Sequence, residues 1–120
     1  MNRWVLLEHK ISGTNLIDIH YDFLIEDQFD CLTWKLHEIP EIKKGSIEIE
    51  KQPNHRLVWL FRTQHQLSND RGFVKRVDHG TFSYIFQNQD SQEFKIILNG
   101  TLLKGLLTIE GNLCQLTKKN

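Results

Sequence analysis

Residues 16–26 read Leu-Ile-Asp-Ile-His-Tyr-Asp-Phe-Leu-Ile-Glu, a run of eleven that alternates with period two. Because successive side chains of a strand point to opposite faces, this stretch predicts a β-strand with two different faces. The face expected to meet a core carries Ile17, Ile19, Tyr21, Phe23 and Ile25. The other face carries Asp18, His20, Asp22, Leu24 and Glu26. The strand therefore offers an apolar surface for packing and sets an imidazole beside a carboxylate on the opposite side.

Shorter runs of the same kind recur along the chain, separated by turn signals. The further runs that we interpret as strands are residues 3–10, 29–36, 46–50, 56–62, 72–78, 81–87, 93–98, 102–109 and 112–117. Tight turns are expected at His79-Gly80, Asn99-Gly100 and Glu110-Gly111, and at Ser12-Gly13-Thr14-Asn15. Segments 38–45 and 63–71 have the least pattern and are interpreted as loops. We expect an all-β fold, a small antiparallel β-barrel of about eight strands with little helix, and a sandwich is the alternative.

The composition indicates a single globular domain over residues 1–120. Hydrophobic residues make up 39% and charged residues 25% of the chain, and alanine is absent, which disfavours long helices. The formal net charge is zero, whereas nonspecific nucleic-acid binding normally requires a basic surface. The N-terminus lacks the pattern of a signal peptide, and no apolar run reaches membrane-spanning length. We therefore expect a cytoplasmic protein with no membrane partner.

The chain has two cysteines, Cys31 and Cys114. Their positions do not match a metal-binding spacing motif. We interpret them as reduced, buried thiols of a cytosolic protein, with a disulfide as the alternative.

Histidines and one aspartate are the candidates for chemistry. His20 and Asp22 are two residues apart on a strand, so their side chains point the same way from Cα atoms roughly 7 Å apart. With His9 on the preceding segment, they form a donor set that suits a divalent transition metal such as manganese or zinc. His55 begins an apolar run and is a candidate hydrogen-bond donor to a phosphate group, or a candidate general acid. The competing interpretations are a solvated surface pair for His20 and Asp22, and a surface turn histidine for His55.

Six motifs occur in a definite order along nearly the whole chain. They are Glu8-His9, His20-Tyr21-Asp22-Phe23, Thr33-Trp34, Asn54-His55-Arg56-Leu57-Val58-Trp59, Gly-Phe-Val-Lys-Arg-Val-Asp-His-Gly-Thr-Phe over residues 72–82, and Leu-Asn-Gly-Thr-Leu-Leu-Lys-Gly over residues 98–105. This ordered set resembles the 3'-phosphoesterase domain of bacterial DNA ligase D, also called the DNA polymerase-ligase N-terminal-like domain. The chain looks like a short, divergent, stand-alone relative of that domain.

The resemblance implies an antiparallel β-barrel that holds manganese, with zinc as the alternative. Carried over by motif, the metal ligands are His9, His20 and Asp22, and the histidine that contacts phosphate is His55. The catalytic group is then His55 together with His20 and Asp22. The implied substrate is a nucleic-acid 3' end or a related phosphoester, and a DNA-repair ligase or polymerase is the implied partner.

The chain departs from the family pattern at three places. The arginine that follows His-Tyr-Asp-Phe in the family is Leu24 here, and a tyrosine after the phosphate-contacting histidine is Trp59. His9 and His20 are also farther apart along the chain than their family counterparts. Two hypotheses follow: a metal-dependent phosphoesterase of the DNA-repair type, or a catalytically degenerate relative that binds a metal, a nucleic-acid end or a partner protein without turnover. A barrel with a small-molecule pocket and no nucleic-acid role ranks third.

Overall fold

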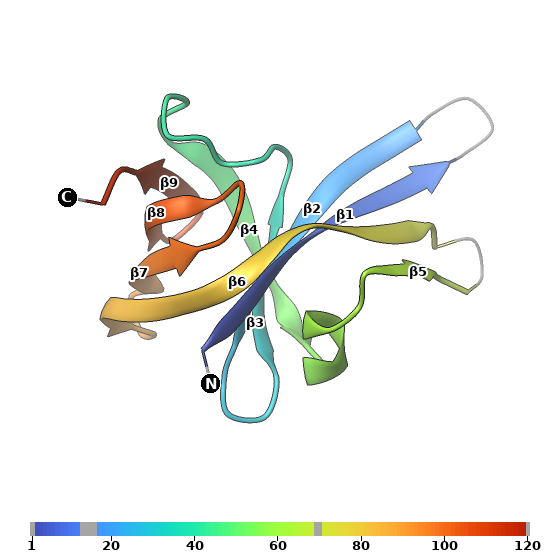
Figure 1. Cartoon of the computed structure of the whole chain (residues 1–120), viewed down its shortest axis with the longest axis horizontal. Helices are drawn as coiled ribbons and strands as arrows, with labels where there is room; N and C mark the ends of the chain where they lie inside the picture. The colour runs from blue at the N-terminus through green and yellow to red at the C-terminus, as the bar shows by residue number, and fades with distance from the viewer. Residues whose placement is uncertain (1, 13–16, 69–70, 120) are drawn as a thin grey trace.

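The computed structural model describes residues 2–12, 17–68 and 71–119, and antiparallel strands dominate it (Figure 1). The elements in chain order are β1 (Arg3–Ser12), β2 (Ile17–Glu26), β3 (Cys31–Leu36), β4 (Ile47–His55), the 3-10 helix η1 (Leu57–Leu60), β5 (Gln64–Gln66), β6 (Phe73–Asn88), β7 (Glu93–Asn99), β8 (Lys104–Glu110) and β9 (Leu113–Thr117). The predicted all-β, antiparallel fold is confirmed. In the described part of the chain, no helix is long and apolar enough to cross a membrane.

Eight of the strands hydrogen-bond in a ring, which gives the molecule a barrel-like form. The sheet order is β1-β2-β3-β4-β9-β8-β7-β6-β5, and β1 also pairs with β6. The weakest seam lies between β4 and β9, where only Ile47 with Cys114 and Glu48 with Leu113 are in register. The short strand β5 lies outside the ring and pairs with the beginning of β6. The ring therefore supports an open, projecting region built on β1, β2, β5 and β6 (Figure 1).

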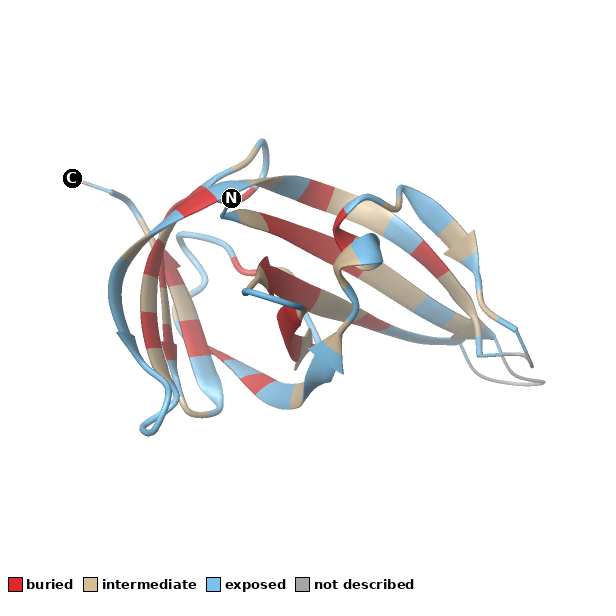
Figure 2. Ribbon diagram, turned by 90° about the horizontal axis from the view of Figure 1, so that it is seen from below, coloured by how far each residue is buried: buried red, intermediate tan, exposed pale blue. Residues whose placement is uncertain are grey.

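Apolar side chains gather in two clusters of unequal size. Figure 2 shows where the buried residues lie along the strands. The larger cluster, here the main core, fills the ring with Trp4, Leu6, Phe23, Ile25, Leu32, Trp34, Leu36, Ile47, Ile49, Phe82, Phe94, Ile96, Leu98, Leu103, Leu107, Ile109, Cys114 and Leu116. The smaller one, here the second cluster, comprises Val5, Leu7, Leu24, Cys31, Leu60 and Val74. Since neighbours along β1 and β2 alternate between the two clusters, these strands are buried on both faces over part of their length.

The predicted faces of β2 hold for only half of the strand. Phe23 and Ile25 reach the main core, but Ile17 and Ile19 are 63% and 41% exposed. Their end of β2 belongs to the projecting region, where no second layer covers that face. On the face predicted to be polar, Leu24 is fully buried in the second cluster.

Two predicted elements are wrong. The apolar run over residues 56–62 forms η1 instead of a strand, and Leu60 closes the second cluster from there. Short apolar runs do not distinguish a strand from a helical turn by periodicity alone. His79-Gly80 makes no hairpin, because β6 continues through it for sixteen residues. Gly80 allows close approach instead: a Cβ there would lie 2.0 Å from the carbonyl oxygen of Asn99.

The remaining expectations about turns and loops have mixed outcomes. The turns at Asn99-Gly100 and Glu110-Gly111 are confirmed as the β7–β8 and β8–β9 connections. Segment 63–71, predicted as a loop, contains β5, while the turn predicted at 12–15 lies largely outside the described residues. Both cysteines are buried and have free thiols, as expected.

Candidate metal centre

The three predicted metal ligands meet on one face of the β1–β2 ladder. His9 and His20 are directly opposite each other in the antiparallel register, and Asp22 lies two residues farther along β2 on the same side. Each residue offers one ligand atom, and these three atoms all lie within 4.8 Å of one another. Opposite residues of an antiparallel pair have neighbouring side chains, so the register itself creates the group. Beyond the histidines, residues 10–12 of β1 stay paired with residues 17–19 of β2.

The distances within this group are short. His9 Nδ1 and His20 Nε2 are 3.0 Å apart. The Asp22 carboxylate lies 3.6 Å from His20 Nε2 and 3.9 Å from His9 Nδ1. Two nitrogen ligands on a tetrahedral zinc, each at about 2.0–2.1 Å, are roughly 3.3 Å apart. The three donors therefore fit a divalent transition metal after shifts of a few tenths of an ångström.

A backbone carbonyl sets the orientation of His9. His9 Nε2 lies 2.7 Å from the carbonyl oxygen of Arg71, which can only accept a hydrogen bond. The proton of neutral His9 therefore sits on Nε2, and the lone pair on Nδ1 faces His20 and Asp22. Carbonyl partners of this kind commonly orient histidines that ligate metals.

Gly72 makes this contact sterically feasible. Its φ is +103°, and a Cβ there would lie 2.4 Å from the carbonyl oxygen of Lys10 and 3.2 Å from His9 Nε2. Only glycine adopts this backbone conformation without strain while approaching β1 so closely. The segment that ends in Arg71 and Gly72 is thus held against His9.

Burial favours the neutral form of the His20 imidazole. Its exposed fraction is 8%, and burial lowers its pKa, an effect that Asp22 opposes and the nearby His9 reinforces. A neutral imidazole is the form that binds a metal. Among the described residues, no group hydrogen-bonds to its buried Nδ1. His20 therefore makes its polar contacts through Nε2, the atom that faces the donor group.

A cavity of about 410 Å³ opens beside these ligands. His9, Asp22 and His55 all line it, so the structure brings His55 to the same cavity as the metal ligands. His55 Nδ1 lies 3.1 Å from the carbonyl oxygen of Pro53 and therefore carries the proton of the neutral ring. Its Nε2 remains available for a ligand, as an acceptor when the ring is neutral and as a donor when it is protonated.

Two arginines that the motif comparison did not assign also line the cavity. Arg56 follows His55 directly, and Arg71 comes from the segment before β6. Both side chains are exposed at the rim and carry permanent positive charge. Arg71 is one of the basic residues that could replace the family arginine, but sequence spacing does not place it beside His9, because the two are far apart along the chain.

Two of the departures from the family pattern, at Leu24 and Trp59, have different structural outcomes. Leu24 lies on the same face of β2 as His20 and Asp22, but its side chain is fully buried in the second cluster and does not line the cavity. Trp59 does line the cavity. Its ring packs edge-on against His55, with centroids 6.4 Å apart, and Arg62 lies over it at 4.8 Å. The indole ring of Trp59 therefore forms one side of the cavity beside the candidate metal centre.

Comparisons with known proteins identify no family for this chain. No protein-family model matches it, and no curated protein has a significantly similar sequence.

Proposed function

We propose that the protein is a metal-dependent phosphoesterase of the DNA-repair type that acts on nucleic-acid 3' ends. His9, His20 and Asp22 would hold manganese, with zinc as the alternative. The observation that carries the proposal is the convergence of their three ligand atoms within 4.8 Å, beside a cavity that His55 also lines. A cytoplasmic protein with reduced cysteines fits this role, and a DNA-repair ligase or polymerase is the kind of partner we expect.

The side chains around the cavity suit a terminal phosphate. Arg56 and Arg71 supply the positive charge that the buried Leu24 cannot. The Arg56 guanidinium can bind phosphate oxygens in pairs, whereas Nε and Nη2 of Arg71 donate to the carbonyl and hydroxyl oxygens of Ser68. A protonated His55 would donate from Nε2 to a phosphoryl or leaving oxygen. A metal bound here would polarise the phosphoryl group and lower the pKa of a coordinated water. Trp59 adds an aromatic surface against which the terminal base can stack.

The absence of an arginine at position 24 favours a second candidate. Leu24 belongs to the second cluster, and among the described residues that line the cavity both arginines are exposed at its rim. In this alternative, the centre binds a metal and a nucleic-acid end or a partner protein without turnover.

Metal binding is tested first, by calorimetric titration of Mn²⁺ and Zn²⁺ into the protein. We expect one ion per chain, and His20→Ala should abolish binding because it removes a buried donor. His79→Ala is the matched control, since His79 is exposed on β6 and does not line the cavity beside the three ligands. Equal affinities of the wild type and His20→Ala would refute the metal centre.

Turnover is tested with an oligonucleotide that carries a 3'-phosphate, by measuring released inorganic phosphate with Mn²⁺ present. The expected result is release by the wild type and a loss of about 10²-fold or more in His55→Ala, with metal affinity unchanged. Stoichiometric metal binding without phosphate release by the wild type would select the non-catalytic alternative.

A further inference from the structure

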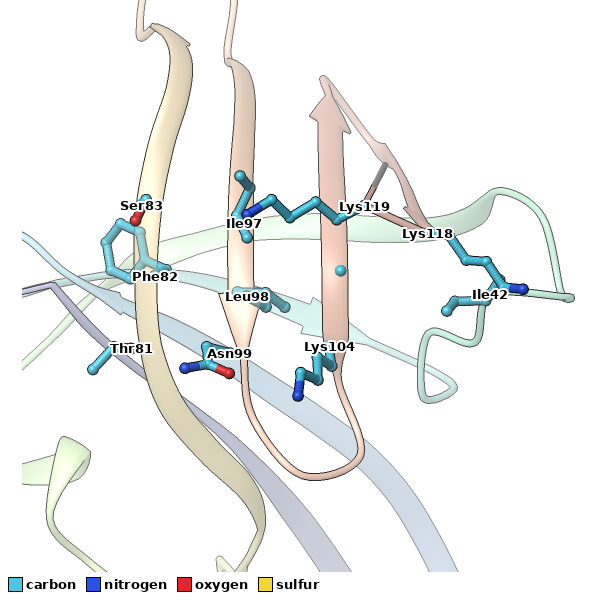
Figure 3. Close-up of a pocket in the computed structure, with 11 residues that line it drawn as sticks. Ile42, Thr81, Phe82, Ser83, Ile97, Leu98, Asn99, Lys104, Lys118 and Lys119 are labelled. Carbon is cyan, nitrogen blue, oxygen red and sulfur yellow. The ribbon is translucent and has the colours of Figure 1, made fainter.

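A second and larger cavity, of about 630 Å³, lies on the outer face of β6, β7 and β8 (Figure 3). Cross-strand pairing places Thr81 opposite Asn99, Ser83 opposite Ile97, and Asn99 opposite Lys104. Because residues opposite each other share a face of the sheet, these five side chains form one continuous surface. Three of them offer hydroxyl or amide donors, and one carries an ammonium group.

Two more lysines, which follow the last strand, lie beside this surface. Lys118 and Lys119 follow β9 directly and also line the cavity. Gly105 explains how they come close: its φ is +140°, and a Cβ there would lie 2.4 Å from the carbonyl oxygen of Thr117. The end of β9 therefore lies tightly against the beginning of β8. This contact brings both lysines to the same cavity as Lys104.

The charge of the lining is entirely positive. The residues that line the cavity include three lysines and no aspartate or glutamate. Over the residues that the structure describes, none of the three lysines forms an ion pair. Three ammonium groups around one cavity attract an anion. A phosphate group is favoured over a single carboxylate, since it accepts several hydrogen bonds and carries more charge.

The cavity also contributes apolar contacts and has a limited size. Ile42 and Ile97 line it together with the lysines (Figure 3). A volume of this order suits a small molecule. We propose that this cavity, the lysine cavity, binds a small organic phosphate with a compact apolar part.

The lysine cavity is distinct from the candidate metal centre. Val74 lines the cavity beside the metal ligands, and Thr81 lines the lysine cavity. The two residues are seven positions apart on β6, a separation of roughly 23 Å along a strand. Binding at one place therefore does not require the other, and the proposal stands whether or not the metal centre exists.

The test uses phenylphosphonate, which has a doubly ionisable phosphonate on a flat apolar ring and which a phosphoesterase cannot hydrolyse. Titration into the ¹⁵N-labelled protein should shift the backbone amide signals of Thr81, Ser83, Ile97 and Asn99 saturably. Benzyl alcohol, the neutral analogue, should leave them unchanged. No saturable shift up to about 10 mM, or equal shifts with benzyl alcohol, would overturn the proposal.

A charge-reversal pair then locates the site. Lys104→Glu should weaken phenylphosphonate binding about fivefold or more, because it replaces an attractive charge with a repulsive one. Lys75→Glu makes the same change in net charge at an exposed site on β6 that lines neither cavity, and it should leave the affinity unchanged. Equal weakening in both variants would mean that only the net charge matters, and the site would be refuted. Amide spectra of each variant without ligand establish that it is folded.

Discussion

The two faces of β2 meet different surroundings. On one face, Phe23 and Ile25 pack into the main core, which a ring of strands encloses. On the other, Leu24 packs into the smaller second cluster, and His20 and Asp22 join His9. The three candidate ligands lie where β2 passes from the packed part of the molecule into the projecting region, since Phe23 is buried while Ile19 is 41% exposed. His55 and Arg71 come from the end of β4, which pairs with β3, and from the segment before β6. The candidate centre therefore has one side against packed strands and another side open to the cavity.

Truncation of the main core should have the largest effect. Phe23 is 2% exposed and packs against Trp4 and Trp34, with ring centroids 5.9 and 6.2 Å away. Phe23→Ala should lower the free energy of unfolding by about 3–5 kcal/mol, measured by urea denaturation. Leu24→Ala, its neighbour in the second cluster, should cost only about 2–3 kcal/mol, because a smaller side chain is removed from a smaller cluster. An equal or larger loss for Leu24→Ala would contradict the ranking of the two clusters.

The β7–β8 connection has a single ionic anchor, Asp78. Its buried carboxylate accepts hydrogen bonds from the backbone N–H groups of Thr101, Leu102 and Leu103 at 3.2, 2.8 and 2.8 Å. Asp78→Asn should lower the free energy of unfolding at pH 7 by about 2 kcal/mol, since hydrogen bonds to a charged acceptor are lost. Asp78→Asn should therefore destabilise the ring of strands without changing the affinity of the candidate metal centre for Mn²⁺ or Zn²⁺.

The pH dependence checks the cause of this loss. Burial alone would raise the pKa of Asp78, but the backbone hydrogen bonds outweigh it, and the pKa lies below its ordinary value. The stabilisation is therefore fully present above the unfolded-state pKa of about 3.9 and is lost as the pH falls through the lower folded-state pKa. The difference between the wild type and Asp78→Asn should shrink below about pH 4. A difference that does not change with pH would show that the charge is not the cause.

The sequence predicted the strands and the grouping of His9, His20 and Asp22 far better than the surroundings of that group. The period-two alternation is enough to predict β2. The order of the motifs grouped His9, His20 and Asp22 correctly, because a single hairpin sets the antiparallel register of their two strands. The sequence pattern could not reveal that Leu24 is buried, because the residues of the second cluster come from elements that are far apart in the chain, β1, β2, η1 and β6 among them. Gly80 was misread as a turn because glycine serves both for turns and for close backbone contact.

Gly72 tests how much the projecting region contributes to the metal centre. In Gly72→Ala, strain at φ +103° and a clash with the Lys10 carbonyl should displace the Arg71 carbonyl from His9. We expect about tenfold weaker Mn²⁺ or Zn²⁺ binding by calorimetry, which is the usual effect of losing an outer partner of a ligand. The loss of stability should be about 1–3 kcal/mol. Gly111→Ala is the control for strain alone, because its φ is +57° and a Cβ there meets nothing within 4 Å. If both variants bind metal equally well, the Arg71 contact does not position His9.

The two cysteines offer the mildest test, since each reports on one cluster without any substitution. Cys31 lies in the second cluster and Cys114 in the main core, and burial raises the pKa of each thiol to about 12. Because both thiols are buried, a difference in alkylation rate under native conditions reports how often each cluster opens. We expect Cys31 to react with iodoacetamide about tenfold faster than Cys114, as followed by peptide mass spectrometry, since the second cluster is small and borders a cavity. Equal rates would mean that both clusters open only when the whole molecule unfolds. The ring and the projecting region would then be one cooperative unit, and the metal centre would be as rigid on its open side as on its anchored side.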